Sequence, residues 1–171
     1  MKQLTLILLL VPLLAFCQQN TNTAPDTKVS WEIRGAEIRM TKEFHRESQR
    51  SYEEIHVSIL KNKTATRPEG IAVTIPFDAI NDHGIVLAFY SKEKNRVERI
   101  SAKFPACEGG LCTFSFKNGC VQNELTGKEA DVFEKFKNFE YLYVSFKDSQ
   151  DLFSVIEIPL KDFSDAYSRL K

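Results

Sequence analysis

The sequence predicts a mainly β protein: an antiparallel β-sandwich or partly closed barrel with two short helices, the second at the C-terminus. Three observations lead to this prediction. Apolar residues alternate with polar ones in most segments after residue 28, turn residues separate these segments at short intervals, and the apolar period becomes helical in only two places. Residues 29–171 are enough for one ordinary domain with its own core, so we expect a single β-sandwich domain there.

The chain begins with the features of a secretory signal. Lys2 precedes an apolar run over residues 4–16, which is too short to span a bilayer. We therefore expect residues 1–16 to be a signal peptide and the protein to be exported.

Cys17 follows this run in the sequence Leu14-Ala15-Phe16-Cys17, which resembles a bacterial lipobox, where the cysteine becomes the lipidated first residue. The alternative is cleavage after Cys17 by ordinary signal peptidase, which releases a soluble protein beginning at Gln18. We favour lipidation at Cys17. Residues 17–28 support it, because they are polar, lack an apolar pattern and are typical of a flexible tether.

Alternation predicts the strands of the first half. The apolar positions lie in residues 29–33, 38–40, 55–59, 71–75 and 85–89. Pro76 ends the fourth of these segments, because proline cannot donate to a central ladder. The charged residues 41–53 are predicted to be either a polar edge strand with a long hairpin or a mobile surface loop, and residues 92–96 a hairpin tip.

The second half mixes strands with the two helices. Strands are predicted at residues 100–104, 112–116, 142–146 and 156–160, with turns at residues 117–119 and 148–151. Thr126 and Glu129 have the spacing of a capping box, followed by Ala130, Phe133 and Phe136 at helical spacing. The apolar pattern of residues 163–170 predicts a terminal amphipathic helix capped by Asp162 or Ser164.

Composition and charge exclude several partners. The chain has 23 Lys and Arg against 23 Asp and Glu, so it lacks the basic excess expected for binding nucleic acid or a polybasic membrane patch. Its thirteen Phe fall mostly in alternating or helical patterns and are assigned to the core.

Three cysteines, Cys107, Cys112 and Cys120, lie close together in the predicted domain. An exported chain favours one structural disulfide, which leaves one thiol over, and the residues alone do not choose the pair. Their spacing lacks a fourth metal ligand and the C-x-x-C of a redox motif, so no metal or other cofactor is predicted.

No catalytic site is predicted. His45, His56 and His83 are the only histidines, and none stands beside a nucleophile motif. Glu53 and Glu54 would point to opposite faces of a strand, and the turn with Asp148 and Asp151 has too few ligands for calcium.

The order of several motifs resembles the invasion-associated locus B family of bacterial envelope proteins. These motifs are Trp31-Glu32-Ile33, Ile71-Ala72-Val73-Thr74-Ile75-Pro76, His83-Gly84-Ile85-Val86-Leu87, Phe104-Pro105-Ala106-Cys107, Gly119-Cys120-Val121, Leu142-Tyr143-Val144-Ser145-Phe146, and Ile156-Glu157-Ile158-Pro159-Leu160-Lys161-Asp162-Phe163 followed by Ala166-Tyr167 and Leu170. The chain departs from the family in lacking a cysteine pair near the N-terminal Trp31. Members are periplasmic or outer-membrane proteins linked to host-cell invasion, without an established catalytic site. The resemblance also implies a disulfide between Cys120 and either Cys107 or Cys112.

We therefore expect a non-enzymatic cell-envelope lipoprotein, anchored at the outer membrane or periplasmic face, that presents its β-sandwich to another protein in host-cell invasion or attachment. This hypothesis requires an exposed apolar or aromatic patch and no deep polar pocket. The alternative is a carrier of a small apolar ligand, with a cavity between the sheets lined by Phe89, Phe114 or Phe146. A third hypothesis, an enzyme or thiol-redox factor, requires an exposed cysteine of low pKa.

Overall fold

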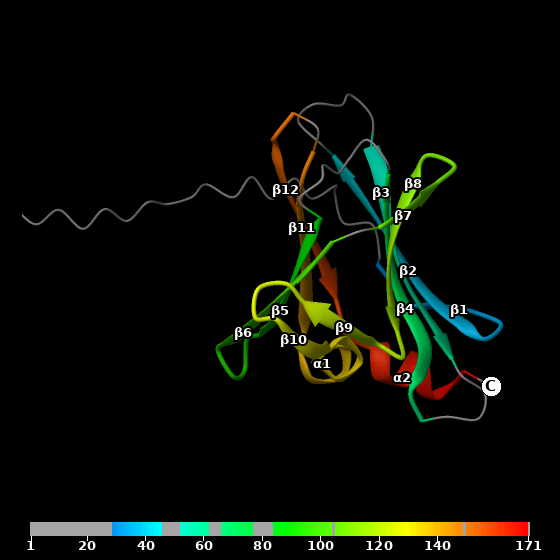
Figure 1. The fold of residues 1–171 in the computed structure, drawn as a ribbon. Helices are drawn as coiled ribbons and strands as arrows, with labels where there is room; N and C mark the ends of the chain where they lie inside the picture. Colours follow the sequence, from blue (N-terminus) through cyan, green and yellow to red (C-terminus); the bar gives the residue numbers. More distant parts are fainter. Residues whose placement is uncertain are drawn as a thin grey trace, which may run out of the picture.

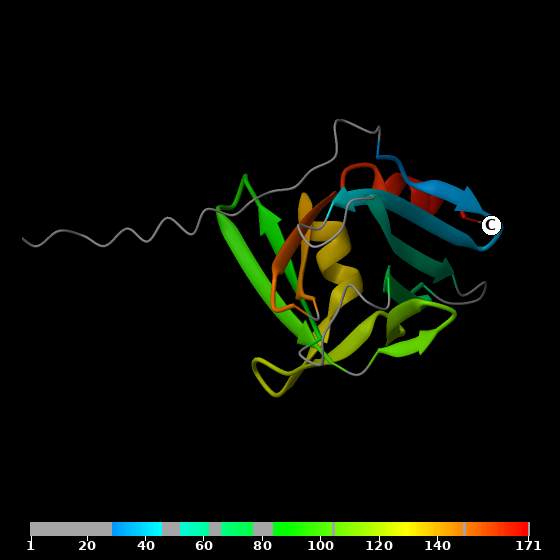
Figure 2. The same ribbon diagram turned by 90° about the horizontal axis from the view of Figure 1, so that it is seen from above.

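Two antiparallel sheets pack face to face around an apolar core in the computed structural model, which describes residues 29–45, 52–61, 66–76, 84–103, 105–148 and 150–170 (Figures 1 and 2). The first has six strands in the order β1 (Glu32–Arg34), β2 (Glu37–His45), β3 (Tyr52–Lys61), β4 (Pro68–Pro76), β8 (Leu111–Lys117) and β7 (Ala106–Glu108). The second has four, in the order β12 (Phe153–Pro159), β11 (Tyr141–Lys147), β5 (Ile85–Ser91) and β6 (Arg96–Ala102). The sheets do not close into a barrel, so the structure confirms the mainly β fold and its sandwich form.

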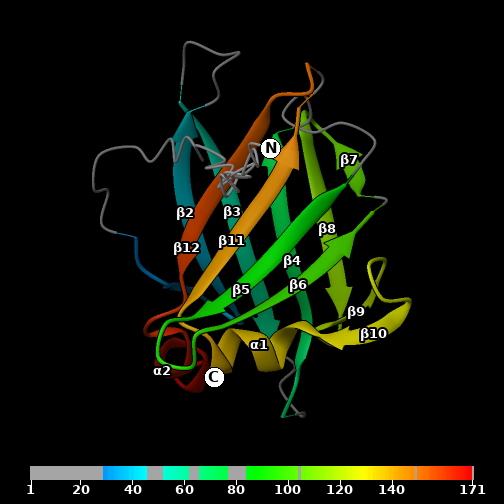
Figure 3. The same ribbon diagram turned by 90° about the vertical axis from the view of Figure 1, so that its left-hand side faces the viewer.

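A small hairpin and two helices complete the fold. The hairpin pairs β9 (Cys120–Asn123) with β10 (Lys128–Asp131), and α1 (Val132–Asn138) follows it directly. The second helix, α2 (Phe163–Ser168), is C-terminal as predicted. Both helices lie at one end of the sandwich, called here the helical end (Figure 3).

Strand alternation produces the core between the sheets. Ile55, Val57 and Ile59 of β3 are buried, while the residues between them face outward. Across the sandwich, Phe44 of β2 meets Phe146 of β11 edge to face, with ring centroids 5.8 Å apart. Such pairs add about 0.5–1.5 kcal/mol to the burial of the rings themselves.

An aromatic cluster closes the helical end. Phe163 of α2 packs edge to face on Trp31 and on Phe136 of α1, with centroids 5.2 and 5.3 Å apart. Phe133 joins from the same helix, 6.2 Å from Phe163. The period of α1 buries Val132, Phe133 and Phe136 on one side, which is why this short helix is stable only against the sheets.

The start of α1 corrects the predicted capping box. Thr126 lies in the turn between β9 and β10, and residues 128–131 pair with β9 as a strand. Asp131 is the N-cap instead, and its Oδ1 accepts a hydrogen bond of 2.9 Å from the backbone N–H of Glu134. Asp162 precedes α2 as predicted, but makes no side-chain cap bond.

The N-terminal strands also differ from expectation. Strand β1 has only three residues, and Ile33 is 43% exposed, whereas Trp31 just before it is buried. Residues 41–45 form the outer half of β2, which pairs with β3 alone, as an edge strand would. Residues 46–51 lie outside the described residues.

Gly119 sits where the turn after β8 meets α1. Its φ is +74°, and a Cβ added there would lie 2.7 Å from Cβ of Phe133. By contrast, Gly35 in the β1–β2 turn has a φ of +64° with nothing within 4 Å of an added Cβ.

These two glycines give a matched test of the packing. Both Gly35→Ala and Gly119→Ala carry a backbone cost of about 1–2 kcal/mol for the left-handed conformation. Gly119→Ala adds an overpacking cost of about 1–3 kcal/mol against Phe133. We expect urea unfolding to show the larger loss for Gly119→Ala; equal losses would contradict the close contact.

Candidate functional site

The outer face of the four-stranded sheet, which faces the viewer in Figure 3, is exposed at one side of the sandwich. It carries aromatic and aliphatic side chains where polar ones would ordinarily meet solvent. We call this surface the aromatic face. It comprises Val86, Ala88, Tyr90, Val97, Arg99, Ser101, Tyr141, Tyr143, Ser145, Lys147, Phe153, Val155, Glu157 and Pro159. Because the core side chains alternate with them along β5, β11 and β12, the members on these strands point away from the core; on β6, Val97 and Arg99 are exposed and Ser101 is buried.

Strand register arranges the aromatic face in rows that cross the four strands. The row nearest the helical end is Pro159, Tyr141, Tyr90 and Val97. The middle row is Glu157, Tyr143, Ala88 and Arg99. The third row is Val155, Ser145, Val86 and Ser101. Within these three rows only the two ends of the middle row carry charge, and Lys147 lies in the next row, opposite Phe153.

Three tyrosines form the centre of this surface. The Tyr141 ring lies 6.4 Å from the ring of Tyr90 and 6.4 Å from that of Tyr143. The Tyr143 hydroxyl donates a 2.8 Å hydrogen bond to Oε2 of Glu157. Burial raises the pKa of Tyr143 above its usual value and the bond to Glu157 raises it further, so the hydroxyl stays protonated as a donor.

The aromatic face is hollowed at its small residues. An open depression of about 510 Å³ is lined by nine residues of this surface, including Ala88 beside Tyr143. Phe153 is 62% exposed and Val97 is 49% exposed. Single exposed apolar residues are ordinary, but a continuous apolar surface with polar groups at its margins is typical of a binding site.

The outer face of the six-stranded sheet has the opposite character, and we call it the hydroxyl face. One row across it consists of Thr41, His56, Thr74 and Thr113. The hydroxyls of Thr74 and Thr113 are hydrogen-bonded to each other at 3.0 Å. The hydroxyl of Thr41 is hydrogen-bonded to Nδ1 of His56, also at 3.0 Å. Next to this row, Ala72 lies between Ser58 and Ser115.

His56 is half-buried in the hydroxyl face. Its Nε2 lies 3.5 Å from Oε2 of Glu54. Burial lowers the pKa of His56 most strongly; Glu54 opposes the shift, and Arg39 and Arg34 reinforce it. The neutral imidazole is therefore the favoured form in the folded protein near neutral pH.

The disulfide joins Cys107 to Cys112, which corrects the expected bridge to Cys120. The turn at Gly109 and Gly110, with φ of +59° and +80°, folds β7 back on β8 and sets the two cysteines directly opposite. Cys112 and Lys117 are five residues apart on β8, or about 17 Å, and Cys120 lies beyond Lys117. A disulfide needs Cα atoms within about 7 Å, so the strand keeps Cys120 out of reach.

Cys120 is a free thiol held by Arg67. Nη2 of Arg67 lies 3.4 Å from the Cys120 sulfur, and Nη1 forms a 2.8 Å ion pair with Asp131. Burial raises the pKa of Cys120 and Asp131 adds to this, while Arg67 opposes it. The low-pKa thiol that a thiol-redox factor requires is therefore not found at Cys120.

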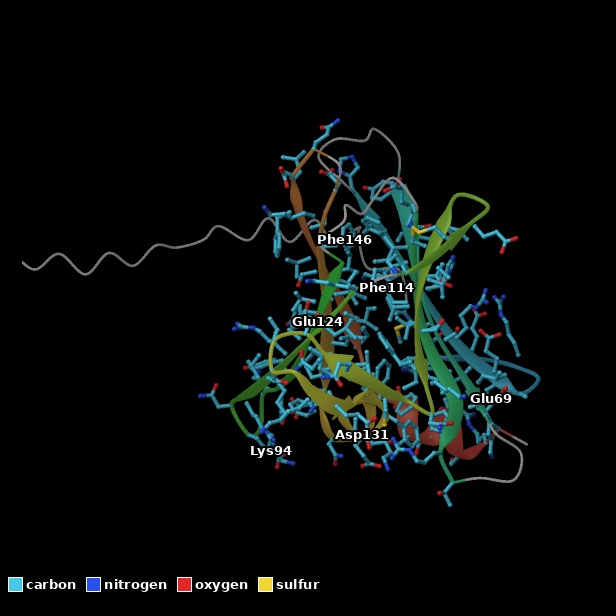
Figure 4. The ribbon with its side chains drawn as sticks, viewed as in Figure 1. Glu69, Lys94, Phe114, Glu124, Asp131 and Phe146 are labelled. Carbon is cyan, nitrogen blue, oxygen red and sulfur yellow. A yellow bond between two sulfur atoms is a disulfide. The ribbon has the colours of Figure 1, made fainter. Side chains whose placement is uncertain are left out.

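The phenylalanines expected to line a carrier cavity are core residues. Phe89, Phe114 and Phe146 are at most 2% exposed. Figure 4 places Phe114 and Phe146 between the two sheets, and Phe89 packs on Phe136 and Phe139. They fill the space between the sheets with side chains.

The remaining predicted site residues are dispersed. The ring of His45 packs on Tyr52, with centroids 5.7 Å apart. Cys17, His83 and residues 1–28 lie outside the described residues. In the part of the chain that the structure describes, no group of three or more His, Cys, Asp or Glu could hold a metal ion. No helix there is long and apolar enough to cross a membrane.

Comparison with known proteins yields no family model, no curated protein and no solved structure that matches this chain.

The sequence prediction did not include the aromatic face, although a signal was present. It assigned the inward set of each alternating pattern and treated the other set as solvent-facing. In β5 and β11, however, the runs Ile85-Val86-Leu87-Ala88-Phe89-Tyr90 and Tyr141-Leu142-Tyr143-Val144 are apolar or aromatic at both parities. Such runs are typical of strands covered on both faces.

The cysteine assignment can be tested by mass mapping. Alkylation of the unreduced, denatured protein should modify Cys120, and proteolysis should release Cys107 and Cys112 as one cross-linked peptide. A Cys120→Ala variant should keep that peptide. Cys120 recovered in a disulfide would contradict the pairing.

The pKa of His56 has a consequence for stability. The unfolded chain binds its proton near pH ~6.5, whereas the folded chain binds it only at lower pH, so folding loses stability as pH falls through this interval. In His56→Gln this part of the pH dependence should disappear from urea unfolding between about pH 7 and pH 5. An NMR titration of His56 at or above its unfolded value would contradict the expected shift.

Proposed function

We propose that this protein is a non-enzymatic cell-envelope lipoprotein whose β-sandwich binds another protein through the aromatic face. The observation that carries the proposal is the continuous apolar surface formed by the outward side chains of β5, β6, β11 and β12. Nothing in the described part of the chain covers this surface, so folding alone does not account for its composition.

The composition of the aromatic face is that of a protein interface. Tyrosine supplies a large contact area at a low entropic cost and is enriched at binding hot spots. Charges are depleted at the centre and occur at the margin, where Glu157 and Arg99 lie. On the hydroxyl face, Tyr52 and Leu111 are exposed, but the rows around His56 carry hydroxyl groups.

Export and anchoring support the same proposal. The features of residues 1–16 and the lipobox-like sequence before Cys17 favour an acylated N-terminus that holds the domain at the envelope. The resemblance to the invasion-associated locus B family favours a role in host-cell invasion or attachment. A protein with this role needs an exposed binding surface and no catalytic centre.

The proposal can be tested with two matched alanines. Ala88 lies in the middle row of the aromatic face, and Ala72 holds the equivalent place in the hydroxyl face; both are half-buried. A strain deleted for the protein should enter host cells less well than its parent. When the deletion strain expresses Ala88→Arg, the entry defect should remain, because this variant places a charge in the apolar depression. When the strain expresses Ala72→Arg instead, entry should be restored.

Cys17→Ser completes the test, since it should leave the chain without an acyl mass and outside the membrane fraction. A deletion strain that enters as well as its parent would contradict the invasion role. Equal behaviour of Ala88→Arg and Ala72→Arg, with both variants folded, would contradict the assignment of the aromatic face.

A further inference from the structure

We infer that the aromatic face binds a second copy of this chain, in a symmetric dimer whose twofold axis runs parallel to the strands between the two facing sheets. The inference rests on the proposed function and deepens it by naming the partner. It is argued from the order of side chains within the rows.

Symmetry fixes which residues meet. An axis along the strands exchanges the two edges of the sheet and keeps each row in place, so β12 of one copy faces β6 of the other and β11 faces β5. Two twisted sheets pack face to face at about 10 Å with strands within about 30° of each other, which this arrangement satisfies.

Charge selects this axis. In the middle row, Glu157 at one edge of each copy meets Arg99 at the opposite edge of the other, and the contact occurs twice. A twofold axis across the strands would instead place Glu157 on Glu157 and Arg99 on Arg99. Neither side chain forms an ion pair with another described residue, and Oε2 of Glu157 accepts the hydrogen bond from Tyr143.

Side-chain size agrees with charge. Within the same row, the ring of Tyr143 faces Ala88 of the second copy, where the depression of about 510 Å³ can receive it. In the row nearest the helical end, Tyr141 faces Tyr90, which allows aromatic stacking.

Area limits the strength of the dimer. Four strands about 4.8 Å apart and seven residues long at about 3.3 Å each give roughly 400 Å² of sheet plane per copy. Stable interfaces bury about 800 Å² per partner, so we expect a weak dimer that depends on concentration. Anchoring both copies in one membrane would raise their effective concentration.

Charge reversal tests the arrangement. The chain is purified after export of its full-length sequence and examined by sedimentation velocity over a concentration series. We expect a reversible monomer–dimer equilibrium, weakened about tenfold or more by Glu157→Arg and by Arg99→Glu, because each change turns two attractive contacts into two repulsive ones. The double variant should regain the parent's affinity. Glu54→Arg in the hydroxyl face is the control and should leave the equilibrium unchanged.

The outcomes separate this inference from the proposed function. A protein that stays monomeric at every concentration, a dimer that survives both single reversals, or a double variant that stays dissociated would overturn the inference. If Ala88→Arg still blocked host-cell entry in that case, the proposed function would stand, with a different protein on the aromatic face.

Discussion

Burial of one side of each strand is the constraint on which the rest of this structure depends. The facing side chains of the two sheets, among them Ile59, Leu87 and Val144, are fully buried, so a slip of one residue in any strand would turn its core side chains to the solvent. The core therefore fixes the register of every central strand. Once the register is fixed, the outward side chains have no freedom of position either, and they form defined rows.

The two outer faces use this fixed geometry differently. On the six-stranded sheet the rows carry hydroxyls and His56, which satisfy one another by hydrogen bonds and remain compatible with water. On the four-stranded sheet the rows carry tyrosines and aliphatic residues whose burial would be favourable, at about 25 cal/mol per Å² of apolar area. A domain with one polar and one apolar outer face has a preferred direction for contact with other molecules.

The alternation of apolar and polar residues along the chain predicted the features that depend on neighbouring residues. Alternation located the strands with Ile55, Ile71 and Ile85, because their inward apolar set is regular. It failed at the start of α1, where pairing with β9 competes with the capping tendency of Thr126 and moves the cap to Asp131. The disulfide pairing depends on distances between strands, and the spacing of cysteines along the chain does not contain those distances. The aromatic face could be predicted only from the order of strands in the sheet, which places β11 beside β5.

The position of Trp31 relates the fold to its surroundings. Its ring packs on Phe163 of α2, so the described chain enters the domain at the helical end, which is one end of the antiparallel four-stranded sheet. In a pair related by an axis along the strands, both entry points lie on the same side. With the proposed lipid anchor, two neighbours in a single leaflet could then associate side by side without turning over, whereas an axis across the strands would place the two entry points at opposite ends of the pair.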